Sequence, residues 1–155
     1  MIEGVSIRQL RRIPDERGWL MEILRNDSPE YTQFGQVYAT ATYDGTVKGM
    51  HLHMIQTDNI ACVVGMIKLV LFKPPYELDP KCGYWFPIDP FDEYFIGELN
   101  PCLVQVPPGV YHGWKAYGGS SVVVNVPTHP YRYDSPDEYR IDPHSLGYNW
   151  NRIDR

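Results

Sequence analysis

The sequence predicts an all-β domain, either a β-sandwich or a β-barrel, and three observations support that prediction. Short runs rich in β-branched and aromatic residues recur along the chain and are separated by turn residues. The chain holds 13 glycines and 14 prolines among 155 residues, far more than a helical bundle tolerates. No helical periodicity extends beyond about two turns, with residues 89–99 as the weak exception.

The expected elements follow from these runs in chain order. We expect strands at residues 37–43, 60–64, 67–72, 102–106 and 121–126, with a further short strand at 84–86. Gly65-Met66 separates two of these strands and predicts a tight glycine turn between them. Pro107-Pro108-Gly109 ends the strand before it, and the proline-rich stretch 74–90 is expected to be a surface loop.

The length of the chain fits one domain of ordinary size. We expect the barrel to occupy residues 13–127. The stretch 128–155 is polar and shows no core pattern, so we expect it to cap the barrel mouth or to wrap the outside. His129 and His144 belong to that tail and are expected to be exposed.

Charge and composition exclude several classes of protein. The formal net charge of −5 argues against binding to nucleic acid, because proteins that bind phosphate backbones present basic faces. No apolar run approaches the roughly 18 residues of a membrane span, and the N-terminus has no apolar stretch of the signal-peptide type. Cys62, Cys82 and Cys102 form no close pair and are expected to be reduced thiols. These features predict a soluble, cytoplasmic protein.

Histidines are concentrated in two short segments that could share a pocket. His51 and His53 are two residues apart, so on a strand they point to the same side. Asp58 lies just before the next predicted strand, and His112 comes three residues after Gly109 of the Pro-Pro-Gly break. Three imidazoles and a carboxylate would suit iron, manganese, nickel or zinc. The alternative is that these histidines are ordinary core or edge-strand residues without a ligand.

The spacing of these residues resembles the two short motifs of the cupin superfamily, whose members are small β-barrels. The first motif is matched by Gly45, the His51-x-His53 pair, Asp58 in place of the usual glutamate, and Gly65. The second motif is matched at its centre by Pro107-x-Gly109-x-x-His112. The resemblance implies a cupin jelly roll with the histidines inside.

A longer resemblance covers most of the chain, from about Ile13 to Trp150. The segments that carry it, in order, are Asp15-Glu16-Arg17-Gly18-Trp19-x-x-Glu22, Phe34-Gly35-Gln36, Lys48-Gly49-Met50-His51 and Pro108-Gly109-x-x-His112-Gly113-Trp114. They are similar to the dTDP-4-dehydrorhamnose 3,5-epimerases and their shorter relatives. The resemblance implies a homodimer that acts on a nucleotide-linked 4-keto-6-deoxy sugar without a metal cofactor.

The chemistry of such a reaction explains the residue types. A C–H bond beside a ketone loses its proton only when a base is positioned and the enolate oxygen is stabilised. Neutral histidine suits the base because its pKa lies near working pH. The resemblance implies that His51 is this base and that the opposite-face acid is Tyr131, with Tyr133 as the alternative.

The resemblance also implies the residues that bind the substrate. Arg17 matches an arginine that grips the diphosphate, Gln36 matches a substrate-contacting glutamine, and His112 lines the same pocket. Three positions depart from the family: Lys48 replaces an arginine, His53 replaces a glutamine, and Asn59 falls where a lysine stabilises the enolate. The family's acidic partner to the base lies in a C-terminal segment beyond Arg155. Full double epimerisation, a single epimerisation, a ketone shift, metal-dependent cupin chemistry and non-catalytic sugar-nucleotide binding all remain open on the sequence alone.

Overall fold

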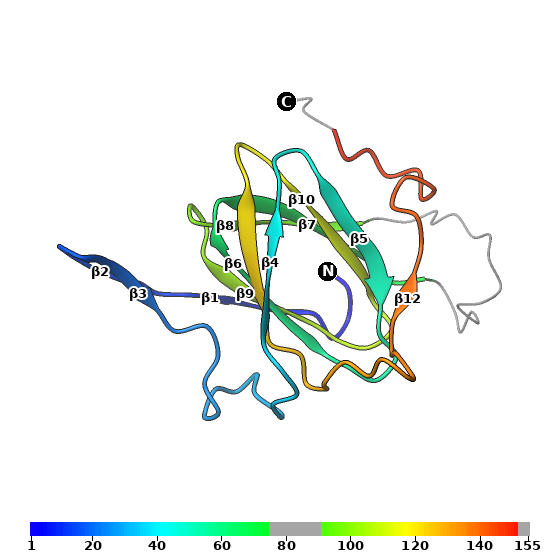
Figure 1. Ribbon diagram of the computed structural model, residues 1–155, viewed down its shortest axis with the longest axis horizontal. Helices are drawn as coiled ribbons and strands as arrows, with labels where there is room; N and C mark the ends of the chain where they lie inside the picture. The colour runs from blue at the N-terminus through cyan, green and yellow to red at the C-terminus, as the bar shows by residue number, and fades with distance from the viewer. Residues whose placement is uncertain (75–90, 152–155) are drawn as a thin grey trace.

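The computed structural model describes residues 1–74 and 91–151, and in these residues the regular structure consists of β-strands without a helix. Two five-stranded antiparallel sheets make up the body of the molecule (Figure 1). The order of the first sheet is β1-β9-β6-β11-β4, and that of the second is β12-β5-β10-β7-β8. The all-β, jelly-roll prediction is therefore confirmed. None of the described segments could cross a membrane as an apolar helix.

The two sheets draw their strands alternately from the whole chain. The first consists of β1 (Ser6–Gln9), β4 (Tyr38–Thr42), β6 (Asp58–Val64), β9 (Cys102–Val106) and β11 (Ser121–Asn125). The second consists of β5 (Val47–Leu52), β7 (Met66–Phe72), β8 (Asp92–Gly97), β10 (Tyr111–Ala116) and β12 (Tyr139–Arg140). A separate hairpin of β2 (Arg12–Asp15) and β3 (Gly18–Met21) projects away from the sheets (Figure 1).

The strand predictions hold where hydrophobic alternation was strongest. The strands expected at 37–43, 60–64, 67–72, 102–106 and 121–126 are β4, β6, β7, β9 and β11. The helical reading of residues 89–99 is wrong, because Asp92–Gly97 is strand β8 and pairs with β7. The strand expected at 84–86 and Cys82 lie outside the described residues.

Gly65 forms the expected tight turn, but the strands on either side of it do not pair. Its φ of 70° lies in the left-handed region, where glycine is favoured. A Cβ at this position would also lie 2.4 Å from the backbone oxygen of Ser120. β6 pairs with β9 and β11, whereas β7 pairs with β8 and β10. The turn therefore carries the chain from one sheet to the other.

The main core lies between the two sheets. Alternate residues of β6, β7 and β9 point inward, so each of these strands contributes every second side chain to it. The fully buried members of this core include Ile60, Ile67, Leu69, Leu71, Ile96, Val104, Val106 and Val123. Cys62 and Cys102 are free thiols buried in the same core. At one end this core reaches the histidines, since the ring centroid of Trp114 lies 6.1 Å from that of His51.

The C-terminal tail covers the outer face of the second sheet. Leu146 and Trp150 are 3% and 5% exposed and pack with Val70 and Phe72 of β7. The Nζ of Lys68, on the same face, donates to the carbonyl oxygen of Trp150 at 3.1 Å. Part of the tail thus lies against the outside of the sheet, and its apolar residues are spaced too widely in the sequence to form a recognisable period.

Candidate active site

Three strands bring the predicted histidines and the aspartate together. His51 of β5 lies opposite His112 of β10 in the strand register, and their ring centroids are 4.4 Å apart. His53 follows β5 on the same side, with its ring centroid 5.8 Å from that of His51 and 5.6 Å from that of His112. The two strands approach closely at a glycine pair, since a Cβ on Gly49 would lie 2.5 Å from the Cα of Gly113.

Asp58 enters the same cluster from the opposite sheet. Its Oδ2 lies 3.0 Å from Nε2 of His112 and 3.4 Å from Nε2 of His53. Its Oδ1 accepts a hydrogen bond of 2.6 Å from Nε2 of Gln56. The carboxylate is 1% exposed, so it is removed from water and held between two imidazoles.

The other ring nitrogens of these two histidines face backbone carbonyl oxygens. Nδ1 of His53 lies within hydrogen-bond distance of the carbonyl oxygen of Asp137, and Nδ1 of His112 is 3.2 Å from that of Val110. A carbonyl oxygen can only accept, so each Nδ1 carries a proton and donates it. Each Nε2 is thereby directed at the carboxylate, where the arrangement favours a proton or a metal ion between nitrogen and oxygen.

The neighbouring charges move the pKa values in opposite directions. Burial and the nearby His112 lower the pKa of His51 well below its ordinary value, so His51 is neutral at neutral pH. Burial also acts on His53, but hydrogen bonding and charge attraction to Asp58 outweigh it and raise the pKa of His53. Burial opposes ionisation of Asp58, yet the hydrogen bonds from His112 and His53 hold its pKa well below the usual range.

A cavity of about 460 Å³ opens beside this cluster. His51 and His53 form one wall, and Tyr38 of β4 lies on the opposite sheet. The segment 129–138 covers the cavity. The lining residues are Gln36, Tyr38, His51, His53, Ile55, Gln56, His129, Pro130, Tyr131, Arg132, Tyr133, Ser135, Asp137 and Glu138. Most of these side chains carry a polar group, and a concave site of this size and polarity suits a small polar organic ligand.

Several residues expected at the site do line this cavity. Gln36 and Tyr131 are both part of it, and Oε1 of Gln36 accepts from the backbone N–H of Tyr131 at 3.2 Å. The hydroxyl-bearing ring of Tyr131 packs against that of Tyr133 with 4.9 Å between centroids. His129, which was expected to be exposed, is only partly exposed and lines the cavity, whereas His144 is exposed.

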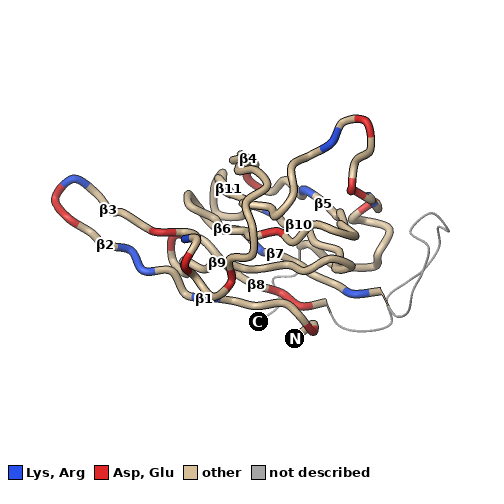
Figure 2. The backbone as a smooth tube through the Cα atoms, turned by 90° about the horizontal axis from the view of Figure 1, so that it is seen from below, with Lys and Arg blue, Asp and Glu red and all other residues tan. Residues whose placement is uncertain are grey.

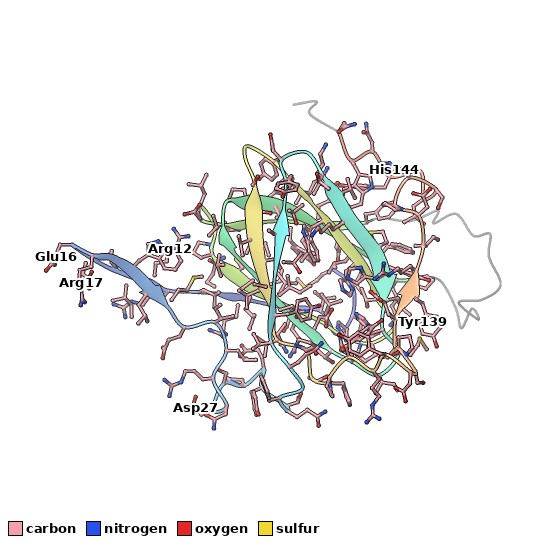
Figure 3. All side chains as sticks on the ribbon, in the orientation of Figure 1. Arg12, Glu16, Arg17, Asp27, Tyr139 and His144 are labelled. Atoms are coloured by element: carbon pink, nitrogen blue, oxygen red, sulfur yellow. The ribbon has the colours of Figure 1, made fainter. Side chains whose placement is uncertain are left out.

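His112, expected to line the pocket, is 1% exposed and is not among the lining residues, and three further expected residues lie away from the cavity. Arg17 is at the tip of the β2–β3 hairpin, far from the sheets, where it pairs with Asp15 at 2.5 Å (Figure 3). Nζ of Lys48 donates to the carbonyl oxygen of Ala41 at 2.6 Å. Asn59 points to the opposite face of β6 from Asp58, because successive residues of a strand alternate.

The side chain of Asn59 makes its hydrogen bonds on that outer face. Its Nδ2 donates to the carbonyl oxygen of Val126 at 2.8 Å, and its Oδ1 accepts from Nε2 of Gln105 at 3.1 Å. The enolate-stabilising role expected for Asn59 is therefore not supported. The residue of β6 that faces the histidines is Asp58.

Sequence reasoning missed Tyr38 and Asp137. Tyr38 could have been found from the alternation in β4, since it shares the inward face with Thr42, whose Oγ1 accepts from Nε1 of Trp114 at 3.0 Å. Asp137 gave no local signal. Its contacts are to backbone N–H groups more than eighty positions earlier in the chain.

Comparison with known proteins agrees with this geometry. The family model for dTDP-4-dehydrorhamnose 3,5-epimerase matches residues 1–155. The chain is 33% identical to the spore coat polysaccharide biosynthesis protein SpsL of Bacillus subtilis strain 168, over 97% of both chains. It is 35% identical to the probable low-salt glycan biosynthesis epimerase Agl13 of Haloferax volcanii, over 97% of this chain and 95% of that protein.

Solved structures show the same fold. A dTDP sugar isomerase from Desulfovibrio desulfuricans G20 superposes with a TM-score of 0.82 at 30% identity, over 99% of this chain and 94% of that one. The sugar epimerase NovW from Streptomyces spheroides, at 19% identity, shares the fold with a TM-score of 0.75, over 98% and 77% of the two chains. From its match over the whole length and from its histidine-lined barrel, the chain belongs to the dTDP-4-dehydrorhamnose 3,5-epimerase family of sugar-nucleotide isomerases.

Proposed function

We propose that the protein epimerises a nucleotide-linked 4-keto-6-deoxy sugar by removing a proton beside the ketone, with His51 as the base. The observation that carries this proposal is a neutral imidazole on the wall of a cavity large enough for a sugar, beside a charged histidine–carboxylate cluster. A neutral histidine accepts a proton from carbon without first having to lose one.

His53, His112 and Asp58 provide the electrostatic setting for that step. Both ring nitrogens of His53 face oxygen acceptors, and its raised pKa favours the protonated ring. The imidazolium of His53 places a positive charge on the cavity wall beside His51, with the two ring centroids 5.8 Å apart. That charge favours the enolate, in which negative charge develops on the former ketone oxygen.

Tyr131 is the proposed acid on the opposite face of the sugar. It lines the same cavity as His51 but comes from the covering segment 129–138. Delivery of a proton from that side, after His51 has removed one from the other, inverts the carbon centre. Gln36 contacts the substrate from the cavity wall, and it also holds the backbone of Tyr131.

A homodimer completes the site in this proposal. The β2–β3 hairpin projects from its own barrel with Ile13, Trp19 and Leu20 between 43% and 59% exposed, as expected for a surface that packs on a second copy. Figure 2 shows acidic and basic residues together at its tip, which includes Arg17. We assign Arg17 to the diphosphate in the partner's cavity, since it lies far from the cavity of its own chain.

Proton exchange with heavy water tests the proposed reaction. Purified protein incubated with dTDP-4-keto-6-deoxyglucose in deuterium oxide should introduce deuterium at carbon beside the ketone, as read by NMR or mass spectrometry. His51→Asn should lower that rate by about 10²–10⁴-fold. His144→Asn, which changes an exposed histidine of the tail, is the matched control. Equal rates for His51→Asn and wild type would exclude His51 as the base.

A metal-dependent cupin reaction is the second candidate, and one observation favours it. One potential ligand atom from each of His51, His53, Asp58 and His112 lies within 4.8 Å of the others. The Nδ1 groups of His53 and His112 also donate to carbonyl oxygens, which is the usual outer arrangement around metal-bound histidines. These four residues would hold the ion, and a divalent transition metal would polarise a substrate carbonyl.

Elemental analysis separates the two candidates. Protein prepared without chelator is expected to contain less than stoichiometric transition metal if the base mechanism is right. Stoichiometric metal in wild type, lost in His53→Ala together with activity, would favour the metal-dependent reaction instead.

A further inference from the structure

The proposed reaction needs a hydrogen-bond donor for the enolate oxygen, and the structure does not assign that role to Asn59. The Asn59 side chain is committed to Val126 and Gln105 on the outer face of β6. Of the arginine and lysine side chains in the described residues, Arg132 alone lines the cavity, and it is exposed on the covering segment. His53 also lines the cavity, but its two ring nitrogens already face the carbonyl oxygen of Asp137 and Oδ2 of Asp58, so the donor is sought among the neutral groups of the fixed walls.

Tyr38 occupies a fixed wall of the cavity. It is the first residue of β4, and alternation along the strand places it on the same inward face as Thr42. β4 belongs to the first sheet, whereas His51 comes from the second, so the two residues approach the cavity from opposite sheets. A sugar held between the sheets would meet the base on one side and the phenol on the other.

The hydroxyl of Tyr38 is oriented by a buried asparagine. Asn125 is 3% exposed, and its Oδ1 accepts from the backbone N–H of Asn59 at 3.0 Å. This contact identifies the other amide atom as Nδ2, which donates to the hydroxyl oxygen of Tyr38 at 2.9 Å. Because the oxygen accepts from Asn125, the phenolic proton is left to donate elsewhere. Within the described residues the hydroxyl makes no further hydrogen bond to protein, and Tyr38 lines the cavity, so the proton is available to a ligand there.

The phenol is also kept in its protonated form. Burial, with a contribution from the charge of Asp58, raises the pKa of Tyr38 to about 12. The hydroxyl is therefore a hydrogen-bond donor at neutral pH, where His51 is a neutral base. A neutral donor that is already in position stabilises a developing oxyanion without any reorganisation during the reaction.

We propose that Tyr38 is a catalytic residue whose hydroxyl donates the hydrogen bond that stabilises the enolate oxygen. In this step the C–H bond beside the ketone breaks and its proton goes to a ring nitrogen of His51. The electron pair forms the carbon–carbon double bond, and the carbonyl π electrons move to the oxygen that Tyr38 contacts. The assignment rests on the proposed epimerase function and adds a residue to it.

Two rates measured together test this role. Tyr38→Phe should lower deuterium exchange and epimer formation by the same factor, about 10²–10³-fold, since both pass through the enolate. The affinity for dTDP and the midpoint of thermal unfolding should change little. Tyr43→Phe is the matched control, because Tyr43 directly follows β4 and is 79% exposed. Tyr131→Phe should instead reduce epimer formation while exchange continues through His51.

The outcomes are distinct. Unchanged rates in Tyr38→Phe, or continued exchange with lost inversion, would overturn the proposal, and the second result would make Tyr38 the proton donor to carbon. Absence of exchange in wild type would reject the epimerase proposal for this substrate and this role with it. Should Tyr38→Phe fold poorly, 3-fluorotyrosine at position 38 provides a second test. Its more acidic hydroxyl should accelerate both rates, and a decrease in both would contradict the proposal.

Discussion

His51 and His53 lie close together, yet their pKa values are shifted in opposite directions. Both imidazoles face the same side of β5 and its extension, and their centroids are 5.8 Å apart. Only His53 and His112 have Nε2 next to Oδ2 of Asp58, so the carboxylate raises the pKa of His53 whereas burial lowers that of His51. One ring is thereby suited to accept a proton and the other to carry one.

The activity should follow the lowered pKa of His51. The base is active only when neutral, and a lowered pKa keeps it neutral further into the acid range. We expect kcat/KM for deuterium exchange to stay constant from neutral pH down past 6.5, and to fall only below that value. A pH profile of exchange between pH 4 and 9 measures this. An acid limb centred above pH 6.5 would contradict the assignment of His51.

Asp58 is expected to dominate the stability of the site. Asp58→Asn removes the charge that the buried imidazoles require, at a cost of about 3–5 kcal/mol in the free energy of unfolding. Folding lowers the pKa of Asp58, so the ionised carboxylate stabilises the fold above about pH 3.8. Folding raises the pKa of His53, so the protonated ring stabilises the fold below about pH 6.5, and this contribution is lost as the pH rises further.

The loss of stability in Asp58→Asn should therefore be largest between about pH 3.8 and 6.5. Urea unfolding at pH 6 and pH 9, with the exposed Asp134→Asn as control, measures the difference. An equal or larger loss at pH 9 would show that the ion pair is not its source.

At the scale of elements, the covering segment 129–138 is attached at both ends. On its N-terminal side, Thr128 exchanges hydrogen bonds of 3.0 Å with Thr57, and Gly35 leaves no space for a side chain against the backbone of His129. On its C-terminal side, the carboxylate of Asp137 accepts from the backbone N–H groups of residues 54, 55 and 56 at 2.8–3.0 Å. The segment thereby holds Tyr131 over the cavity.

Asp137→Asn should loosen the covering segment without unfolding the barrel. An amide in this position can accept at only one of its two ends, so at least one charge-assisted bond is lost, at about 1.5–3 kcal/mol. Trypsin cleavage after Arg132, which is exposed in the segment, should become faster, and kcat/KM should fall. Asp134→Asn removes the same charge three residues earlier and should change neither rate. Equal proteolysis of both variants would show that Asp137 does not anchor the segment.

At the scale of the whole molecule, the position of Arg17 makes the proposed dimer testable. Arg17→Ala and His51→Asn should each be inactive as homodimers. If each hairpin serves the partner's cavity, a heterodimer of the two variants contains one intact site. Mixing equal amounts under conditions that allow subunit exchange should restore about a quarter of wild-type activity. No recovery, with heterodimers shown to form, would mean that Arg17 does not act across the interface.

The sequence predicted the strongest strands and the histidine cluster correctly, for related reasons. β4, β6, β7, β9 and β11 carry period-two patterns that depend only on neighbouring residues. His51 and His53 share a face because of the same period, and their spacing relative to Asp58 and His112 is a motif that can be recognised in the sequence. β8 was misread because its alternation is short and is bordered by charged and aromatic residues on both sides.

The sequence by itself determined the all-β class, the family and the four residues that meet at the base of the cavity, since local alternation and motif spacing encode them directly. Only the tertiary structure decided that Asn59 faces away from the histidines, that Tyr38 stands on the opposite wall and that Asp137 secures the covering segment. Those relations depend on strand phase and on contacts between segments more than eighty residues apart, and no pattern within one segment encodes them.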